Sequence, residues 1–235
     1  MNYTLLELIQ QVTGELGLLP SPSFVVGNTD PQIVQLLALA NRLGRDISRQ
    51  YEWQKLNKEY SFTTVQGQSQ YALPTDWLRQ IPQTEWDRTS QWPLIGPATT
   101  QEWQIYKSAI ISQGPNLRFR IANNFVEVDP PTGDLDLSFF YVSKNWIDAG
   151  GGVYRYKYQA DTDVSMFDDS LMLTGLKVQW KAAKGLDASF DVSEFRAMFD
   201  TIKAQDKSAQ KLSLGSFPRN ILLTEWNIQD GNFPG

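Results

Sequence analysis

The sequence predicts an α+β protein: an antiparallel four-helix bundle with an inserted antiparallel β domain and an extended C-terminal arm. Three observations predict this class. Apolar residues recur at helical spacing near both ends of the 235-residue chain, they alternate with a period of two in the middle, and an irregular apolar segment follows the last helix. We therefore expect a helical bundle domain from residues 1–56 and 165–211, a β-rich insertion domain from residues 57–164, and a C-terminal arm from residues 212–235.

Two helices are predicted before the period changes. Thr4 followed by Glu7 is the pattern of a capping box, and it predicts a helix from about residue 5 to 16. Asp30 before Pro31 is typical of an N-cap with proline at the first helical position. The apolar stripe that follows predicts a second helix that runs to about residue 53.

The central part of the chain is predicted to form short strands joined by turns. The stretch EYSFTTVQGQSQYALP indicates two strands around Gln66–Gln68. Thr99 or Thr100 with Glu102 predicts one short helix. The alternating stretch LRFRI, an Asn123–Asn124 turn, and the stretches FVEVD and LDLSFFYVS predict a meander.

Helical spacing returns near Asp168 and Asp169, either of which can cap a third helix from about residue 169 to 186. Asp191 with Glu194 predicts the start of a fourth helix, which has a narrow apolar face.

The third helix has an unusual distribution of charge. It is apolar around most of its circumference, but Lys177, Lys181 and Lys184 share one stripe at i, i+4, i+7 spacing. We expect this helix at the centre of the bundle, with the lysine stripe toward solvent, a neighbouring subunit or a channel.

Composition excludes several classes of function. The chain has no cysteine, which excludes disulfides, thiol catalysis and cysteine-based zinc sites, and no histidine, which excludes a Ser-His-Asp triad. We expect no enzyme activity, no cofactor and no metal. A net charge of −5 argues against a protein that coats nucleic acid. No signal peptide or membrane span is predicted, so we expect a soluble protein made inside a cell.

Two groups of carboxylates could hold a metal or act as an acid/base pair. They are Glu127, Asp129, Asp134 and Asp136, and Asp161, Asp163, Asp168 and Asp169. Neither group has calcium-loop spacing, and turn formation and helix capping account for most of these residues.

Aromatic and basic residues suggest two further functions. A sugar-stacking platform could come from Trp77, Trp86, Trp92 and Trp103, although tryptophans are more often core or interface anchors. A contact with a phosphate backbone could come from Arg118, Arg120, Arg155, Lys157 and the lysine stripe, although solvated strand faces explain them more simply.

The C-terminal arm has a hydrophobic residue at almost every second or third position, after a bundle that is already complete. Such a segment must be covered, and we favour its docking on another chain.

Two stretches, YALPTDWLRQI and QADTDVSMFDDSLMLTGLKVQWKAAKGLD, together with the start of the second helix, resemble the head-to-tail adaptor proteins of tailed bacteriophages. That group includes connector proteins and the tail tubular protein A of short-tailed phages. The resemblance extends over residues 5 to about 210.

The resemblance implies a structural virion protein. Such proteins form a ring, usually of twelve copies, beneath the portal, where they extend the DNA channel and dock the tail. The implied partners are the portal protein, a tail or nozzle protein and other copies of the chain, while genomic DNA passes without specific binding. The implied location is the head–tail neck of the virion, after assembly in the host bacterial cytoplasm, with no membrane contact.

Three sets of residues are expected to carry these contacts. Portal binding is assigned to Leu214, Phe217, Ile221, Leu222, Leu223 and Trp226. Inter-subunit or lumen positions are Lys177, Lys181, Lys184, Arg196 and Lys203. Tail-facing loops contain Gln66, Gly67, Gln68, Pro130, Pro131 and Gly133. The alternatives are a carbohydrate-binding tail component that uses the tryptophans, and a nucleic-acid-binding module.

Overall fold

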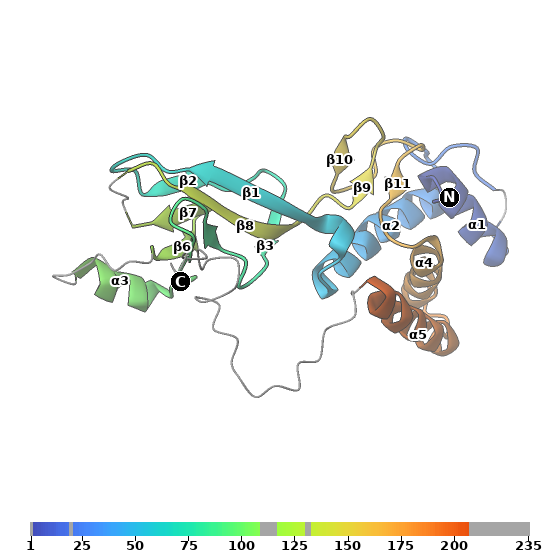
Figure 1. The fold of residues 1–235 in the computed structure, drawn as a ribbon. Coiled ribbons are helices and arrows are strands. Elements are labelled where there is room, and N and C mark those ends of the chain that lie inside the picture. Colours follow the sequence, from blue (N-terminus) through green and yellow to red (C-terminus); the bar gives the residue numbers. More distant parts are fainter. Residues whose placement is uncertain (1, 19–20, 109–116, 130–132, 207–235) are drawn as a thin grey trace, which may run out of the picture. The chain divides into compact units, whose positions relative to one another are not determined.

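The computed structural model describes residues 2–18, 21–108, 117–129 and 133–206 (Figure 1). The described chain divides into two compact units. The first combines the residues up to Asn57 with those from Val142 onward, and the second consists of Lys58–Tyr141. Each unit has its own buried core, so each is considered by itself.

The first unit contains four α-helices and one short 3-10 helix within the described residues. They are α1 (Leu5–Glu15), α2 (Pro31–Gln50), η1 (Gln54–Leu56), α4 (Asp169–Ala183) and α5 (Ser189–Asp206). The expected caps are present. The Glu7 amide donates to Thr4 Oγ1 at 3.3 Å while the Thr4 amide donates to Glu7 Oε2 at 2.9 Å, and Asp30 Oδ1 accepts from the Gln32 amide at 2.8 Å.

The same unit also contains a small antiparallel sheet. Its order is β10 (Tyr154–Arg155), β9 (Ile147–Asp148) and β11 (Val164–Ser165). Trp146, which precedes β9, is fully buried, and its Nε1 donates to the Tyr156 carbonyl at 3.0 Å. This tryptophan anchors the sheet to the helices.

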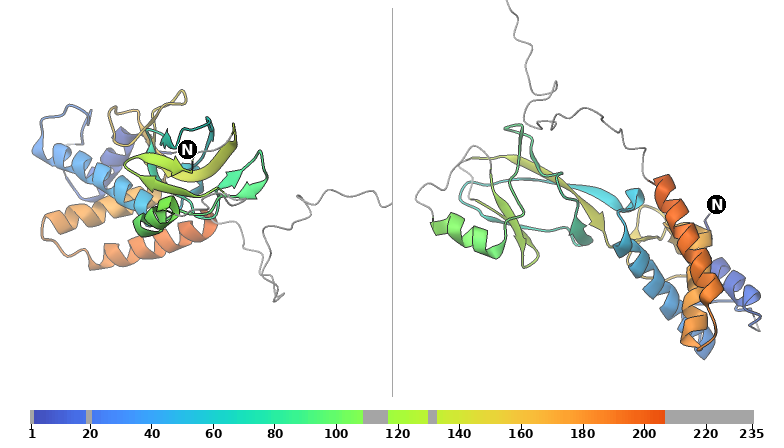
Figure 2. Two further views of the ribbon diagram at one scale, coloured as in Figure 1. Left: turned by 90° about the vertical axis from the view of Figure 1, so that its left-hand side faces the viewer. Right: turned by 90° about the horizontal axis from the view of Figure 1, so that it is seen from below.

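The predicted four-helix bundle with an inserted β domain is wrong. The helix α4 packs against α1, α2 and α5, but α1 and α2 have little mutual contact (Figures 1 and 2). Apart from α4, the C-terminal half of α5 meets the segment after α2, where Phe199 lies edge to face with Trp53 and the Gln54 amide donates to Asp206. Four helices that all line one core would each bury an apolar stripe, whereas no apolar residue of α5 is buried. The structure instead has five α-helices, α3 among them, and several antiparallel sheets in its described part.

The start of α5 also differs from the prediction. This helix begins at Ser189, whose amide donates to Asp187 Oδ1 at 2.9 Å. Asp191 is therefore inside the first turn and buried, instead of forming the N-cap.

The second unit contains two sheets and one helix in its described part. One sheet has the order β1 (Asn57–Thr63), β8 (Asp136–Ser143), β4 (Trp86–Asp87) and β5 (Trp92–Pro93), with β3 (Trp77–Gln80) also paired to β8. The other has the order β2 (Gln70–Ala72), β7 (Phe125–Val128) and β6 (Phe119–Ala122). The helix is α3 (Thr100–Ser108).

The two strands predicted around Gln66–Gln68 form as β1 and β2, but they belong to different sheets and do not pair with each other. The bend between them is closed by a side chain: the Val65 amide donates to the Tyr71 hydroxyl at 2.8 Å. By contrast, the Asn123–Asn124 turn between β6 and β7 forms as predicted. Both asparagines have positive φ, 51° and 67°, as a two-residue type I′ turn requires.

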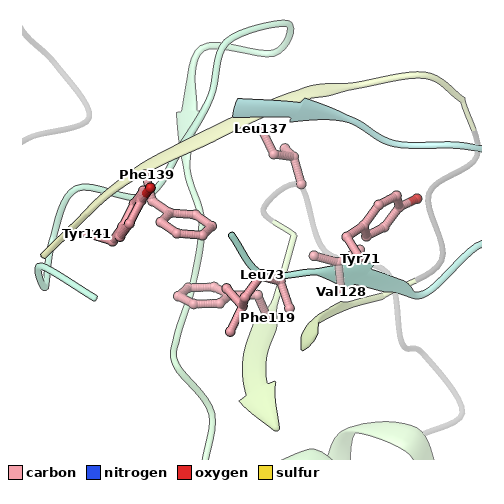
Figure 3. Close-up of a cluster of buried hydrophobic side chains, with 8 residues drawn as sticks. Tyr71, Leu73, Phe119, Val128, Leu137, Phe139 and Tyr141 are labelled. Carbon is pink, nitrogen blue, oxygen red and sulfur yellow. The ribbon is translucent and has the colours of Figure 1, made fainter. Parts of the chain in front are cut away.

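The core of the second unit lies between its sheets (Figure 3). Side chains from β2, β6, β7 and β8, with Leu73 just after β2, point toward one another there. The buried members are Tyr71, Leu73, Phe119, Val126, Val128, Leu137, Phe139 and Tyr141. In β2 this packing leaves Tyr71 buried between two exposed neighbours.

Candidate interaction surfaces

The lysine stripe of α4 is engaged inside its own chain. Lys177 Nζ donates to Glu15 Oε2 at 2.8 Å, which joins α4 to the end of α1. The hydrogen bond from Lys177 lowers the pKa of the Glu15 carboxyl. Both side chains are partly exposed, so the pair contributes about 0.2–1 kcal/mol to stability.

The next two lysines of the stripe lie at the α4–α5 turn. Lys181 Nζ donates to Asp191 Oδ2 at 2.6 Å, and Asp191 is only 6% exposed. Lys184 Nζ lies 4.4 Å from the ring centroid of Trp180, in a cation–π contact. The lysines share one side of α4 because that side faces the C-terminal end of α1, at Glu15, and the first turn of α5, at Asp191.

The outer helix α5 presents an incompletely covered surface. Its apolar residues are Val192, Phe195, Met198, Phe199 and Ile202, and all of them are half-buried. Leu186, in the turn before α5, is 58% exposed, and Phe190, the second residue of α5, is 76% exposed. Arg196 and Lys203 are exposed, and Lys203 Nζ lies 5.5 Å from the Tyr51 ring.

Sequence reasoning missed a second basic stripe, on α2. Arg42, Arg45 and Arg49 are all exposed, on the side opposite the buried Leu36 and Leu43. The signal was present in the sequence, because the helical spacing that identifies the apolar face also places these arginines together on the other face.

The carboxylates of the second group organise the backbone. Asp161 accepts from the amides of Val25 and Val26, at 3.1 and 2.8 Å, and Asp163 accepts from Arg155 Nη1 at 2.9 Å. Asp168 caps α4. Asp169 accepts from the Tyr3 amide at 2.9 Å, and burial raises the pKa of its carboxyl.

The first group of carboxylates is similarly committed to protein contacts. Glu127 accepts from Arg120 and from Gln70, and the pair with Arg120 lowers the pKa of Glu127. Asp129 Oδ2 accepts from the Tyr106 hydroxyl at 2.6 Å. No group of three or more acidic residues that could hold a metal ion occurs in the described part of the chain.

The four central tryptophans do not form a platform. Trp77 packs against Phe139 and Tyr141 in the core of the second unit. Trp103, on α3, is 2% exposed, with Arg120 and Lys107 over its ring. Trp86 is half-buried in β4, and Trp92 is 40% exposed in β5. Sugar binding by stacking needs exposed ring faces, which this arrangement does not supply.

The proposed tail-facing loops are only partly described. Gln66, Gly67 and Gln68 are exposed, and Gly67 has a φ of +80°. The Gly133 carbonyl accepts from Thr64 Oγ1 at 3.2 Å. Pro130 and Pro131 lie outside the described residues, as do all six residues assigned to portal binding: Leu214, Phe217, Ile221, Leu222, Leu223 and Trp226.

An incompletely covered helix and an exposed arginine stripe are typical of proteins that contact other macromolecules. The sequence matches the SU10 adaptor protein family over residues 3–216, and the chain belongs to this family of phage adaptor proteins, which are components of the virion. No curated protein matches the chain. None of its described helices is both long and apolar enough to cross a membrane.

Proposed function

We propose that this chain is the head-to-tail adaptor of a tailed phage, and that copies of it form a ring beneath the portal. Twelve copies are the number that its resemblance to connector and tail tubular A proteins implies. The ring extends the DNA channel and gives the tail a docking surface, without catalysis. Its membership of the phage adaptor family supports the adaptor role.

The observation that carries the ring assembly is the incomplete burial of α5. A helix of 18 residues usually hides its apolar stripe, but α5, which packs on α4 and on the segment around Trp53, has no fully buried apolar residue. Phe190 adds a large exposed aromatic surface at the start of the helix. A neighbouring copy that packs on α5 would cover this surface.

Ring symmetry makes such a contact repeat. In a heterologous interface each copy offers one face and receives another, and the contacts close when the rotation between copies divides a full turn. Arg196 and Lys203, exposed on the polar side of α5, are then positioned for subunit or lumen contacts. The arm residues 212–235 are proposed to bind the portal, and the loops at 66–68 and 130–133 to meet the tail protein.

Phe190→Ser tests the ring. Because the Phe190 side chain is mostly exposed in one copy, its loss should leave the melting temperature of the isolated protein unchanged. Binding to purified portal, measured by sedimentation and counted by electron microscopy, should weaken at least tenfold. Phe24→Ser, at another exposed aromatic residue of the first unit, is the matched control. Rings of normal stoichiometry from Phe190→Ser would show that α5 is not the interface.

A further inference from the structure

The outer face of α2 concentrates positive charge in an acidic protein. At 100° per residue, Arg42, Arg45 and Arg49 fall within about 60° of one another around the helix. Ala38, one turn earlier on the same face, is also exposed and leaves room beside them. Arg42 has a distant partner in Asp46, at 3.7 Å between strongly exposed side chains. Arg45 and Arg49 have no ion pair with the described residues.

Several other cations of the first unit are paired inside the protein. Lys177 and Lys181 form ion pairs with Glu15 and Asp191, and Arg155 pairs with the buried Asp163. The stripe on α2 differs, because Arg45 and Arg49 have no ion pair with the described residues and Arg42 is held only by the long, exposed pair with Asp46.

The spacing and chemistry of this stripe suit a phosphate backbone. Seven residues from Arg42 to Arg49 rise about 10.5 Å along the helix, which is the axial rise of about three base pairs at 3.4 Å each when α2 lies along the duplex. The planar guanidinium group matches phosphate oxygens in a two-pronged geometry that lysine lacks. Three such groups can each reach a phosphate without reading any base.

A second copy of this chain is a poorer match. The polar side of α5 alternates in sign, with Glu194, Arg196, Asp200 and Lys203 all exposed. It therefore offers no continuous acidic strip to the three arginines of the stripe. We propose that Arg42, Arg45 and Arg49 form a weak, sequence-independent contact for the phosphates of duplex DNA. This inference rests on the proposed function, because a channel through the ring would bring DNA to the stripe.

The contact is measured on the full chain with a fluorescent 12-base-pair duplex, by anisotropy between 50 and 200 mM salt. Arg42→Gln/Arg45→Gln/Arg49→Gln should weaken binding at least tenfold at low salt. It should also reduce the slope of log affinity against log salt by about 2–3, since each phosphate contact contributes about 0.9. The control Lys55→Gln/Lys144→Gln/Lys157→Gln removes equal charge from exposed positions of the first unit and should change affinity less than threefold.

Three results would overturn the inference: no salt-sensitive binding by the unaltered protein, equal losses in the two triple variants, or equally strong competition by polyglutamate. The last result would assign the stripe to an acidic polypeptide. Light scattering on the same samples reports assembly separately. The stripe lies within one copy, so DNA binding does not require a ring. If the protein binds DNA but forms no rings, the proposed ring is wrong and the inference about the stripe is retained.

Discussion

Gly44 of α2 and Trp146 are in direct contact, with room between them for a hydrogen atom and no more. A Cβ atom added to Gly44 would lie 2.3 Å from two atoms of the Trp146 ring, which is itself fully buried. The indole also stacks on Phe167 and meets Tyr158 edge to face. The ring is therefore held on several sides, and it cannot move away to admit a methyl group.

We expect Gly44→Ala to destabilise the first unit, although alanine is the better helix former. Overpacking a closed core costs roughly 1–3 kcal/mol, more than the 0.5–1 kcal/mol that alanine gains over glycine in a helix. Gly14→Ala in α1 is the control, because a Cβ there meets nothing within 4 Å. Urea unfolding followed by tryptophan fluorescence should show a lower midpoint for Gly44→Ala and an equal or higher one for Gly14→Ala. Unchanged stability of Gly44→Ala would contradict the contact.

The ion pair at the α4–α5 turn gives a second prediction. Lys181→Met leaves the buried carboxylate of Asp191 without its partner, which should cost roughly 1–3 kcal/mol. Lys184→Met removes only a cation–π contact with Trp180 at an exposed position and should cost about 0.5–1 kcal/mol. A double-mutant cycle with Asp191→Asn measures the coupling directly. A coupling near zero would mean that Lys181 serves another contact, such as a subunit interface.

Alkaline pH tests the contact between α3 and the β2–β7–β6 sheet. Burial, then the hydrogen bond to the Asp129 carboxylate, raises the pKa of Tyr106 to about 12. Since an unfolded tyrosine ionises near pH 10, this residue favours the folded state at lower pH, and that contribution is lost as pH rises from about 10 through 12. Absorbance at 295 nm should follow the ionisation. Asp129→Asn should shift it to lower pH, and Tyr106→Phe should make the loss of stability over this range shallower.

Local signals in the sequence were sufficient for most helices. The capping box of Thr4 with Glu7 recurs at Thr99 with Glu102, where the Thr99 amide donates to Glu102 Oε2 at 2.7 Å. Such contacts form within one turn, so a few neighbouring residues determine where the helix begins. The two-asparagine turn of β6 and β7 is equally local.

Pairings between distant segments could not be read in this way. Alternation shows that β1 and β2 are strands, but it does not show that their partners are β8 and β7, more than fifty residues later in the sequence. The role of Asp191 was similarly not local: its pattern with Glu194 is that of a cap, whereas in the structure α5 begins two residues earlier and Asp191 pairs with Lys181 of α4. The stripe on α2, by contrast, follows from helical spacing alone.

Asp161 and Asp163, in the loop before α4, determine when the N-terminal part of the chain can complete its hydrogen bonds during synthesis. The Leu5 amide donates to the carbonyl of Asp163, the Leu6 amide to that of Asp161, and the Asp161 side chain holds the Val25 and Val26 amides. A nascent chain can form α1 and α2 early, but these amides have no acceptor until the later loop has left the ribosome. At 5–20 residues per second, that delay is on the order of ten seconds. During this interval the apolar sides of both helices are open to chaperones, and rare codons between them and the loop would prolong the exposure.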